Sequence, residues 1–289
     1  MARRKRVLLT GSAGLLGTAV MEVFRKDQEW ELVCRDRGEL DITDAAAVAF
    51  QLRHERPDLV INCAAYTRVD DCESNVEPAM RVNGDGAGNV AAASAEVGAR
   101  LIHLSTDYVF DGTADRPYRE DDPTGRPESL SVYGRSKLAG EQLVSAGHPQ
   151  ALIIRTAWLY GAAGRSFPRT ILELARRQPR LEVVDDQRGS PTNARDLAQA
   201  IAELAKMELR GIVHVTNSGQ CTWCEFARRI VRLAGMDVPI VPVPTERFPR
   251  PARRPQYSVL DQGRFAEAVG RPMRPWTEAV EEFIRHLDE

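Results

Sequence analysis

The sequence predicts a doubly wound α/β fold with a parallel sheet, followed by a smaller C-terminal α/β part. Short apolar segments alternate with helical patterns over the first 160 residues, which is the order expected of a parallel sheet covered by helices. The first apolar segment, residues 6–10, runs into a glycine-rich turn that opens a helix. Beyond residue 160 the alternation loosens and prolines become frequent after Met236, so we expect a second, less regular unit there.

Composition narrows the class of protein. A chain of 289 residues with 43% hydrophobic content can build one large or two smaller cores. Its formal net charge of -2 provides no basic field, so nucleic acid is not an expected partner. No stretch reaches the roughly 18 to 20 apolar residues of a membrane span, and we expect a cytoplasmic protein without a membrane partner.

The five cysteines are expected to be free thiols, because their number is odd and no secretory signal precedes them. Cys221 and Cys224 have the spacing of a redox or zinc motif, but no second pair completes a structural metal site. Thr222 and Glu225 instead predict a capping box that opens a helix. We therefore expect no bound metal.

The apolar segments and turn signals define the expected elements in chain order. The strands are expected at 6–10, 31–34, 59–62, 100–104, 151–155, 181–184 and 212–215. The first helix is expected to follow the glycine turn and to end at about residue 26. Further helices are expected at 45–55, 76–96, 132–145, 167–177, 195–206, 223–234 and 277–287. A loop over 111–130 is long for a compact domain, which is typical of a functional lid.

The turn after the first strand carries Gly11, Gly14 and Gly17 in the spacing G-x-x-G-x-x-G. A strand, a glycine turn and a helix N-terminus together place backbone N–H groups where a pyrophosphate can approach. Tight turns also need glycine for purely structural reasons, but the position after the first strand favours dinucleotide binding.

The end of the second strand distinguishes the two nicotinamide cofactors. An acidic residue there binds a ribose 2'-hydroxyl, whereas an arginine accommodates a 2'-phosphate. The chain offers Arg35 and Arg37 with Asp36 between them. We expect NADPH as the cofactor, with NADH left open.

Tyr133 and Lys137 form the central chemical motif. Residues four apart on a helix share one face, so the ammonium can lie beneath the phenol. A nearby cation lowers the pKa of a phenol, which predicts an acid/base pair. The alternative is an exposed lysine one turn from a half-buried tyrosine. Thr106 follows the fourth strand, where hydroxyls face the ligand crevice of a parallel sheet.

These segments resemble the extended short-chain dehydrogenase/reductases, a superfamily with a Rossmann-type sheet. The resemblance lies in Thr10 to Gly17, in Ser105-Thr-Asp-Tyr-Val-Phe-Asp-Gly112 and in Tyr133-Gly-x-Ser-Lys137. Motifs over 62–70, 155–160, 187–192, 223–227 and 254–261 are similar to those of the dTDP-4-dehydrorhamnose reductases within it. The match extends over nearly the whole chain.

The resemblance implies a hydride transfer from NADPH to the C4 keto group of a dTDP-linked 4-keto-6-deoxyhexose. Thr106, Tyr133 and Lys137 are then the catalytic residues. The implied cofactor-binding residues are Gly11, Gly14, Leu15, Leu16, Gly17, Arg35, Arg37, Asp41, Ile42, Ala65, Tyr66, Thr67, Leu104, Tyr133 and Lys137. The implied substrate residues are Thr106, Asp107, Tyr133, Trp158 and Arg254.

The same resemblance implies how the chain divides. Residues 1–160 and 190–215 would form the dinucleotide-binding domain, and residues 161–189 and 216–289 the sugar-nucleotide domain. The chain departs from the family pattern at Cys63, at Arg35 and in the loop 125–130. The quaternary state is left between a monomer and a homodimer.

Two other functions remain open. A dehydratase or epimerase that acts on sugar nucleotides is one, although similar dehydratases place Asp-Glu after the threonine where this chain has Asp107-Tyr108. The other is a non-catalytic NADP-binding protein, because the regulatory β subunit of methionine adenosyltransferase also resembles this family. Retention of Thr106, Tyr133 and Lys137 together favours an enzyme.

Overall fold

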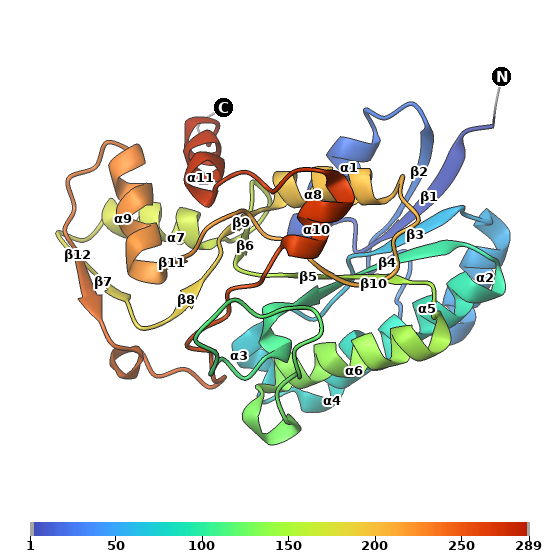
Figure 1. The fold of residues 1–289 in the computed structure, drawn as a ribbon, viewed down its shortest axis with the longest axis horizontal. Coiled ribbons are helices and arrows are strands. Elements are labelled where there is room, and N and C mark those ends of the chain that lie inside the picture. The colour runs from blue at the N-terminus through green and yellow to red at the C-terminus, as the bar shows by residue number, and fades with distance from the viewer. Residues whose placement is uncertain (1–2, 288–289) are drawn as a thin grey trace.

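A six-stranded parallel sheet forms the larger part of the molecule (Figure 1). The computed structural model describes residues 3–287. The strand order is β10-β5-β4-β3-β1-β2. These strands are β1 (Lys5–Thr10), β2 (Trp30–Arg35), β3 (Leu59–Asn62), β4 (Arg100–Thr106), β5 (Leu152–Thr156) and β10 (Gly211–His214). Each neighbouring pair in the sheet is parallel, as the sequence predicts.

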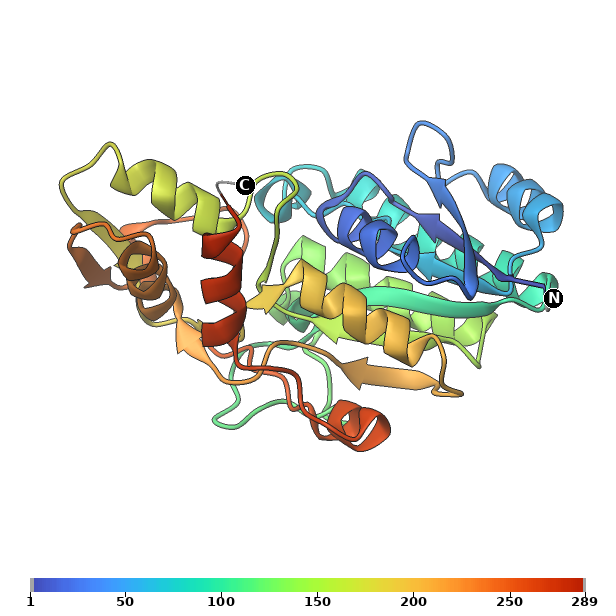
Figure 2. The same cartoon turned by 90° about the horizontal axis from the view of Figure 1, so that it is seen from above.

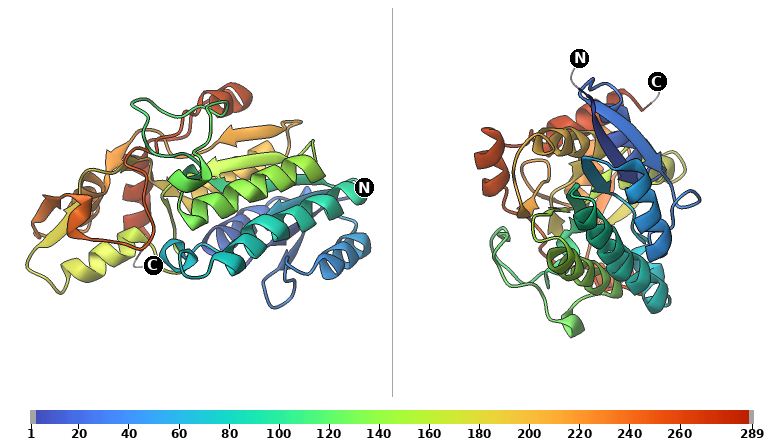
Figure 3. Two further views of the ribbon diagram at one scale, coloured as in Figure 1. Left: turned by 90° about the horizontal axis from the view of Figure 1, so that it is seen from below. Right: turned by 90° about the vertical axis from the view of Figure 1, so that its right-hand side faces the viewer.

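Helices cover both faces of this sheet. One face packs against α1 (Leu15–Phe24) and α8 (Ala194–Leu204), and the other against α2 (Ala45–Glu55), α5 (Ala87–Glu96) and α6 (Val132–Gly147). Figure 3 shows α5 and α6 side by side across the second face. Successive strand residues point to opposite faces, so Val7 and Leu9 join the core beneath α1 while Leu8 joins the core beneath α5. The strands therefore read as continuous apolar runs.

The helix expected over 76–96 is interrupted. The structure has α4 (Val76–Met80), a π-helical segment η1 (Arg81–Gly86) and then α5. Helix α6 presses against this segment, since a Cβ on Gly140 would lie 2.1 Å from the Asn83 carbonyl oxygen. A π-helical turn inserts an extra residue and is found often at functional sites. No periodicity in the sequence reveals it.

A smaller part lies beside one end of the sheet, with α11 (Trp276–Arg285) standing between the two (Figure 2). It contains α7 (Phe167–Ala175), α9 (Trp223–Leu233) and a parallel pair of strands, β7 (Leu181–Val184) and β12 (Ile240–Val243). The predicted capping box of α9 is confirmed, because the Thr222 and Glu225 side chains each accept from the other's backbone N–H. The short strands are β6 (Leu159–Tyr160), β8 (Arg188–Gly189), β9 (Thr192–Asn193) and β11 (Cys221–Thr222).

Two C-terminal elements were not expected. Strand β12 lies in a proline-rich segment, where Pro242 is tolerated because the strand has a neighbour on one side only. Helix α10 (Gly263–Val269) returns to the larger part and buries Phe265 in the core beneath α1 and α8. The remaining short helices are α3 (Val69–Cys72), η2 (Asp107–Val109), η3 (Pro127–Ser129) and η4 (Thr245–Arg247).

The loop 111–130 is tied to the C-terminal segment. The Tyr118 backbone N–H donates to the Val259 carbonyl at 2.9 Å, and the Asp261 N–H donates to the Tyr118 carbonyl at 2.7 Å. The Tyr118 ring also stacks on Phe110 with centroids 4.1 Å apart. The loop is thus fastened at its middle. No helix within residues 3–287 is both long and apolar enough to cross a membrane.

Candidate active site

The glycine turn lies at the point where the strand order changes direction. The chain passes from β1 to β2 on one side and then to β3 on the other, and ligands of open parallel sheets bind at such a switch point. Gly11 has a φ of 67°. A Cβ on Gly17 would lie 2.2 Å from the Gly11 carbonyl oxygen, and a Cβ on Gly11 would lie 2.6 Å from the Ala64 nitrogen. Only glycine fits at these two positions. The N-terminus of α1 therefore lies close to the carboxyl end of β1.

A cavity of about 340 Å³ opens beside this turn. Its walls include the predicted residues Gly11, Gly14, Arg37, Asp41, Ile42, Ala65 and Tyr66. Further walls come from residues outside the predicted set, which are Ala13, Asp36, Leu40, Cys63, Ala64 and Val82. The run of small residues after β3 is the sequence signal that points to several of these.

Several predicted cofactor residues do not line this cavity. Leu16 is buried in the core beneath α1, and Leu15 contacts a second hollow near Gly161. Gly17 acts by allowing the close turn described above. Thr67 lies just past the lining residues, while Leu104 offers its backbone carbonyl to a catalytic candidate.

The two arginines after β2 are placed differently. The Arg35 guanidinium donates to the Glu55 carboxylate at 2.9 Å and to the Cys34 carbonyl at 2.8 Å. Arg37 instead lines the cavity beside Asp36. The Asp36 carboxylate accepts the backbone N–H of Gly38 at 2.8 Å. Of the two arginines, the structure brings Arg37 to the cavity and holds Arg35 in an ion pair.

Thr106, Tyr133 and Lys137 converge at the carboxyl end of β4. Helix α6 begins with Ser131 as its N-cap, whose side chain accepts from the Gly134 N–H, and this start sets the orientation of Tyr133 and Lys137. The Tyr133 phenol lies close enough to the Thr106 side chain for the two to interact. The Lys137 ammonium, which is only 2% exposed, donates to the Leu104 carbonyl at 2.6 Å.

The electrostatics of this cluster differ from the expectation. Burial raises the pKa of the Tyr133 phenol, and the interaction with Thr106 opposes that rise. The expected net lowering of the phenol pKa by Lys137 is wrong, because burial outweighs the favourable interactions of the phenolate. Burial also lowers the pKa of Lys137 to about 8. At neutral pH the phenol is therefore protonated and able to donate a proton, while the ammonium is charged.

A buried ion pair lies directly behind this cluster and was not predicted. The Arg155 guanidinium donates to both oxygens of Glu141, at 2.9 and 2.7 Å, and the two residues are 2% and 4% exposed. The Ser105 hydroxyl donates to the same carboxylate at 2.5 Å. Glu141 stands one helical turn after Lys137 and raises its pKa against the effect of burial. The pair thus joins β4, β5 and α6 and tunes Lys137.

Asn83, in the π-helical segment η1, was also missed. Its side-chain oxygen accepts the Tyr66 N–H at 2.7 Å, and its amide nitrogen donates to the Tyr66 carbonyl at 3.0 Å. The same amide donates to the Ser136 hydroxyl at 2.9 Å, and that hydroxyl donates to the Tyr133 carbonyl at 2.8 Å. One buried side chain therefore fixes the loop that lines the cavity relative to the helix that carries Tyr133.

Of the predicted substrate residues, Asp107 directly follows β4 and Trp158 follows the neighbouring strand β5. Asp107 is buried and accepts the Thr106 hydroxyl at 3.0 Å, and burial raises the pKa of its carboxyl to about 6. Trp158 has a φ of 47°, an unfavourable region for a bulky residue. Its indole stacks on Trp223 with centroids 3.5 Å apart, against Gly189, where a Cβ would lie 2.3 Å from the ring.

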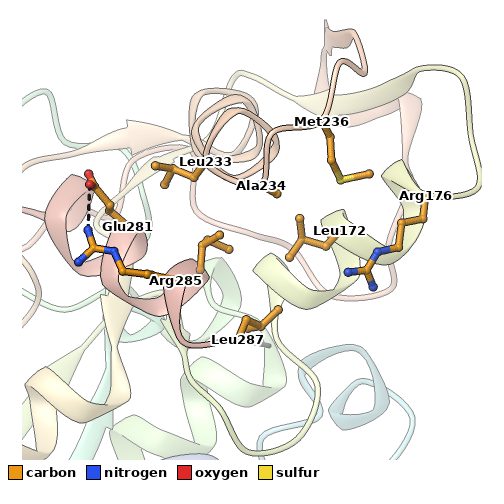
Figure 4. Close-up of a pocket in the computed structure, with 9 residues that line it drawn as sticks. Leu172, Arg176, Leu233, Ala234, Met236, Glu281, Arg285 and Leu287 are labelled. Carbon is orange, nitrogen blue, oxygen red and sulfur yellow. Dashed lines mark hydrogen bonds and ion pairs between the residues drawn. The ribbon is translucent and has the colours of Figure 1, made fainter. Parts of the chain in front are cut away.

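A separate cavity of about 500 Å³ lies in the smaller part, between the C-terminal ends of α7, α9 and α11. Figure 4 shows apolar side chains of all three helices around it, including Leu172, Leu233 and Leu287. Arg176 and Arg285 flank this space, and Arg285 pairs with Glu281 at 3.2 Å. None of the predicted site residues lines it. Its walls also carry the Glu281 carboxylate, which pairs with Arg229 at 2.8 Å as well as with Arg285.

The parallel sheet, the glycine turn at its switch point and the Thr106, Tyr133 and Lys137 cluster define an extended short-chain dehydrogenase/reductase. More narrowly, the chain belongs to the family described as the RmlD substrate binding domain, whose model matches residues 5–289.

Individual relatives agree with this assignment. The chain is 44% identical over 286 residues to the dTDP-4-dehydrorhamnose reductase of Streptomyces griseus, covering 96% of this chain and 93% of that protein. It is 43% identical over 277 residues to the dTDP-4-keto-6-deoxy-D-glucose reductase of Streptomyces niveus, covering 95% of each. A crystal structure of the Bacillus anthracis dTDP-4-dehydrorhamnose reductase in complex with NADP has a TM-score of 0.93 and 39% identity, covering 98% of this chain and 99% of that one.

Proposed function

We propose that the protein catalyses the NADPH-dependent reduction of the C4 keto group of dTDP-4-dehydro-L-rhamnose to dTDP-L-rhamnose. The observation that carries this proposal is the convergence of Thr106, at the end of β4, with Tyr133 and Lys137, which follow one another by one turn on α6 and of which Lys137 donates to the Leu104 carbonyl of β4. The Streptomyces griseus relative supplies the substrate class. We infer that the enzyme works in the cytoplasm, as a monomer or a homodimer.

The residues around the glycine turn fit a dinucleotide. The missing Cβ of Gly17 lets the first turn of α1 pack against the glycine turn, and that of Gly11 lets the glycine turn pack against the segment after β3. No acidic side chain stands in the first turn of α1 to repel a pyrophosphate. Arg37, Asp41 and Ile42 line the cavity. In this proposal Arg37 would pair with a ribose 2'-phosphate, and Asp41 and Ile42 would contact the adenosine end. Ala65, Tyr66 and Thr67 would border the nicotinamide. When bound, NADPH supplies the hydride.

The protein's own residues handle the proton. Tyr133 stays protonated at neutral pH because burial raises its pKa, so its phenol can donate to the oxygen on which negative charge develops during reduction. The Thr106 hydroxyl, which donates to Asp107 in this structure, would rotate to donate a second hydrogen bond to the same oxygen. The Lys137 ammonium lies one helical turn away and holds positive charge near the phenolate that forms.

Residues of both parts complete the substrate site in this proposal. Asp107 and Trp158 would contact the sugar, and Arg254 the diphosphate. On this view, residues 1–160 and 190–215 hold the dinucleotide, and residues 161–189 and 216–289 hold the sugar nucleotide. The strained backbone of Trp158 is consistent with a functional position.

Replacement of Tyr133 by phenylalanine tests the reaction. The expected result is a fall in kcat of about 10² to 10⁴, the usual contribution of a positioned general acid, with an unchanged dissociation constant for NADPH. The rate is followed by NADPH consumption with dTDP-4-dehydro-L-rhamnose. As a matched pair, Thr106→Ser keeps a hydroxyl and should retain activity, whereas Thr106→Val should lose it. Equal rates for Tyr133→Phe and the parent would refute the role of the phenol.

A related 4-keto sugar is the second candidate substrate, because a relative at 43% identity is named as acting on dTDP-4-keto-6-deoxy-D-glucose. A comparison of kcat/KM for the two nucleotide sugars, with identification of the products, separates the candidates. If the protein binds NADPH but does not oxidise it in the presence of either sugar, it would instead be an epimerase, a dehydratase or a binding protein.

A further inference from the structure

Asp70 holds the guanidinium of Arg254 across a large separation in sequence. The Nη1 and Nη2 atoms of Arg254 each donate to one carboxylate oxygen of Asp70, both at 2.9 Å. Nη1 also donates to the carbonyl of Ala252 at 2.9 Å, and the Ala252 N–H donates to Asp70 at 3.3 Å. The side chains of Arg254 and Asp70 are 24% and 28% exposed. The pair thus fastens the segment around Arg254 to the start of α3.

These contacts use one edge of the Arg254 guanidinium and leave a second edge available to a ligand. Arginine has five N–H donors in a fixed plane. Asp70 takes the edge formed by Nη1 and Nη2, and Ala252 takes the remaining Nη1 hydrogen. What remains is the Nε–H together with the second Nη2–H, which lie parallel on the neighbouring edge. Two parallel N–H groups are the geometry that binds phosphate oxygens in a bidentate manner.

The pair also lies near the catalytic cluster. The Tyr108 ring packs edge-on against the Tyr133 ring, with centroids 5.4 Å apart. Burial is the main cause that raises the pKa of Tyr108, but the Arg254 charge lowers it and the Asp70 charge raises it, so both charges act at this position. The Arg254 guanidinium therefore lies near the residues proposed above to hold the sugar nucleotide.

We propose that Asp70 is a positioning residue for the diphosphate of the sugar nucleotide: it holds one edge of Arg254 and presents the other edge to the phosphates. This inference rests on the function proposed above and adds a residue to it. Because the carboxylate and the phosphate use different edges, the ligand binds without displacing Asp70. Arg254 then loses little side-chain entropy on binding, since its rotamer is already ordered.

The test compares Asp70→Asn with Asp71→Asn. Asp71 is the next residue along α3, and it pairs with Arg68 at 3.2 Å and not with Arg254, so its variant makes the same change of charge as a control. Calorimetry measures the dissociation constants for dTDP and for NADPH separately. In Asp70→Asn the dissociation constant for dTDP should rise about three- to tenfold, the factor expected when one rotamer-rich side chain must be ordered on binding. In Asp71→Asn it should stay at the parent value.

Two further readouts distinguish positioning from a general structural role. The Asp70→Asn variant should raise KM for the nucleotide sugar with little change in kcat or in NADPH affinity. In an Arg254→Gln background, Asp70→Asn should have no additional effect on dTDP binding, because Asp70 acts through Arg254. An equal loss in both backgrounds, or dTDP affinity in Asp70→Asn at or above that of the parent, would overturn the inference alone. Absence of dTDP binding by the parent would overturn the proposed substrate class as well.

Discussion

The buried pair of Glu141 and Arg155 gives a prediction with a sharp control. Glu141→Gln keeps the size of the side chain but removes its charge, and leaves the Arg155 guanidinium without a counter-ion in a position that is 2% exposed. Breaking a buried pair by removing one partner costs about 3 to 5 kcal/mol. That is a large share of the roughly 5 to 15 kcal/mol by which a native protein is stable.

The measurement is the midpoint of thermal unfolding. At about 2 to 3 °C for each kcal/mol in a chain of this size, Tm should fall by about 6 to 15 °C. Glu96→Gln is the matched control, because Glu96 makes the same two-bond contact with Arg53, at 2.7 and 3.1 Å, with both side chains at least half exposed. Its Tm should hardly change. A similar small shift for both variants would refute the reasoning from burial.

The same substitution has a catalytic consequence. Glu141 raises the pKa of Lys137, which burial otherwise lowers to about 8. Without the carboxylate that pKa falls further, so Lys137 loses its proton at a lower pH. The alkaline limb of kcat/KM should therefore move to lower pH in Glu141→Gln. A limb at the parent position would show that Lys137 does not set it.

Three further predictions follow from the site. In the parent, kcat/KM should be level below about pH 8 and fall above it, because Lys137 with a pKa of about 8 is charged only at lower pH; a profile level to pH 10 would contradict this. Gly17→Ala should abolish NADPH binding or folding, since its Cβ would meet the Gly11 carbonyl oxygen at 2.2 Å, and calorimetry with a folding check by circular dichroism decides. Arg37→Gln should reduce the preference for NADPH over NADH about tenfold, which corresponds to the loss of one charge-assisted contact of about 1.4 kcal/mol. Arg35→Gln should change this preference much less. The measurement is the ratio of kcat/KM for the two cofactors, and a larger effect of Arg35→Gln would assign the role to Arg35.

Periodicity carried most of the fold prediction because both faces of the sheet are covered. Strands buried on two sides need apolar residues at every position, and the segments around Leu8, Val60 and Ile153 show this without a structure. The glycine turn could also be predicted from the sequence, because the close approach to Ala64 excludes a side chain at Gly11. What local pattern could not reveal was η1, a π-helical segment in which Asn83 lies against Gly140 of a helix distant in sequence.

The sequence alone determined that a parallel sheet would place Thr106 and Tyr133 near a glycine turn, since strand ends, turns and helix faces follow from local chemistry. Only the tertiary structure decided which charges meet. Arg35 and Arg37 are two residues apart and chemically identical, yet Arg35 forms an ion pair with Glu55 whereas Arg37 lines the cavity. The pKa of Tyr133 was likewise decided by the packing around it, because burial opposes ionisation more strongly than spacing along a helix can favour it.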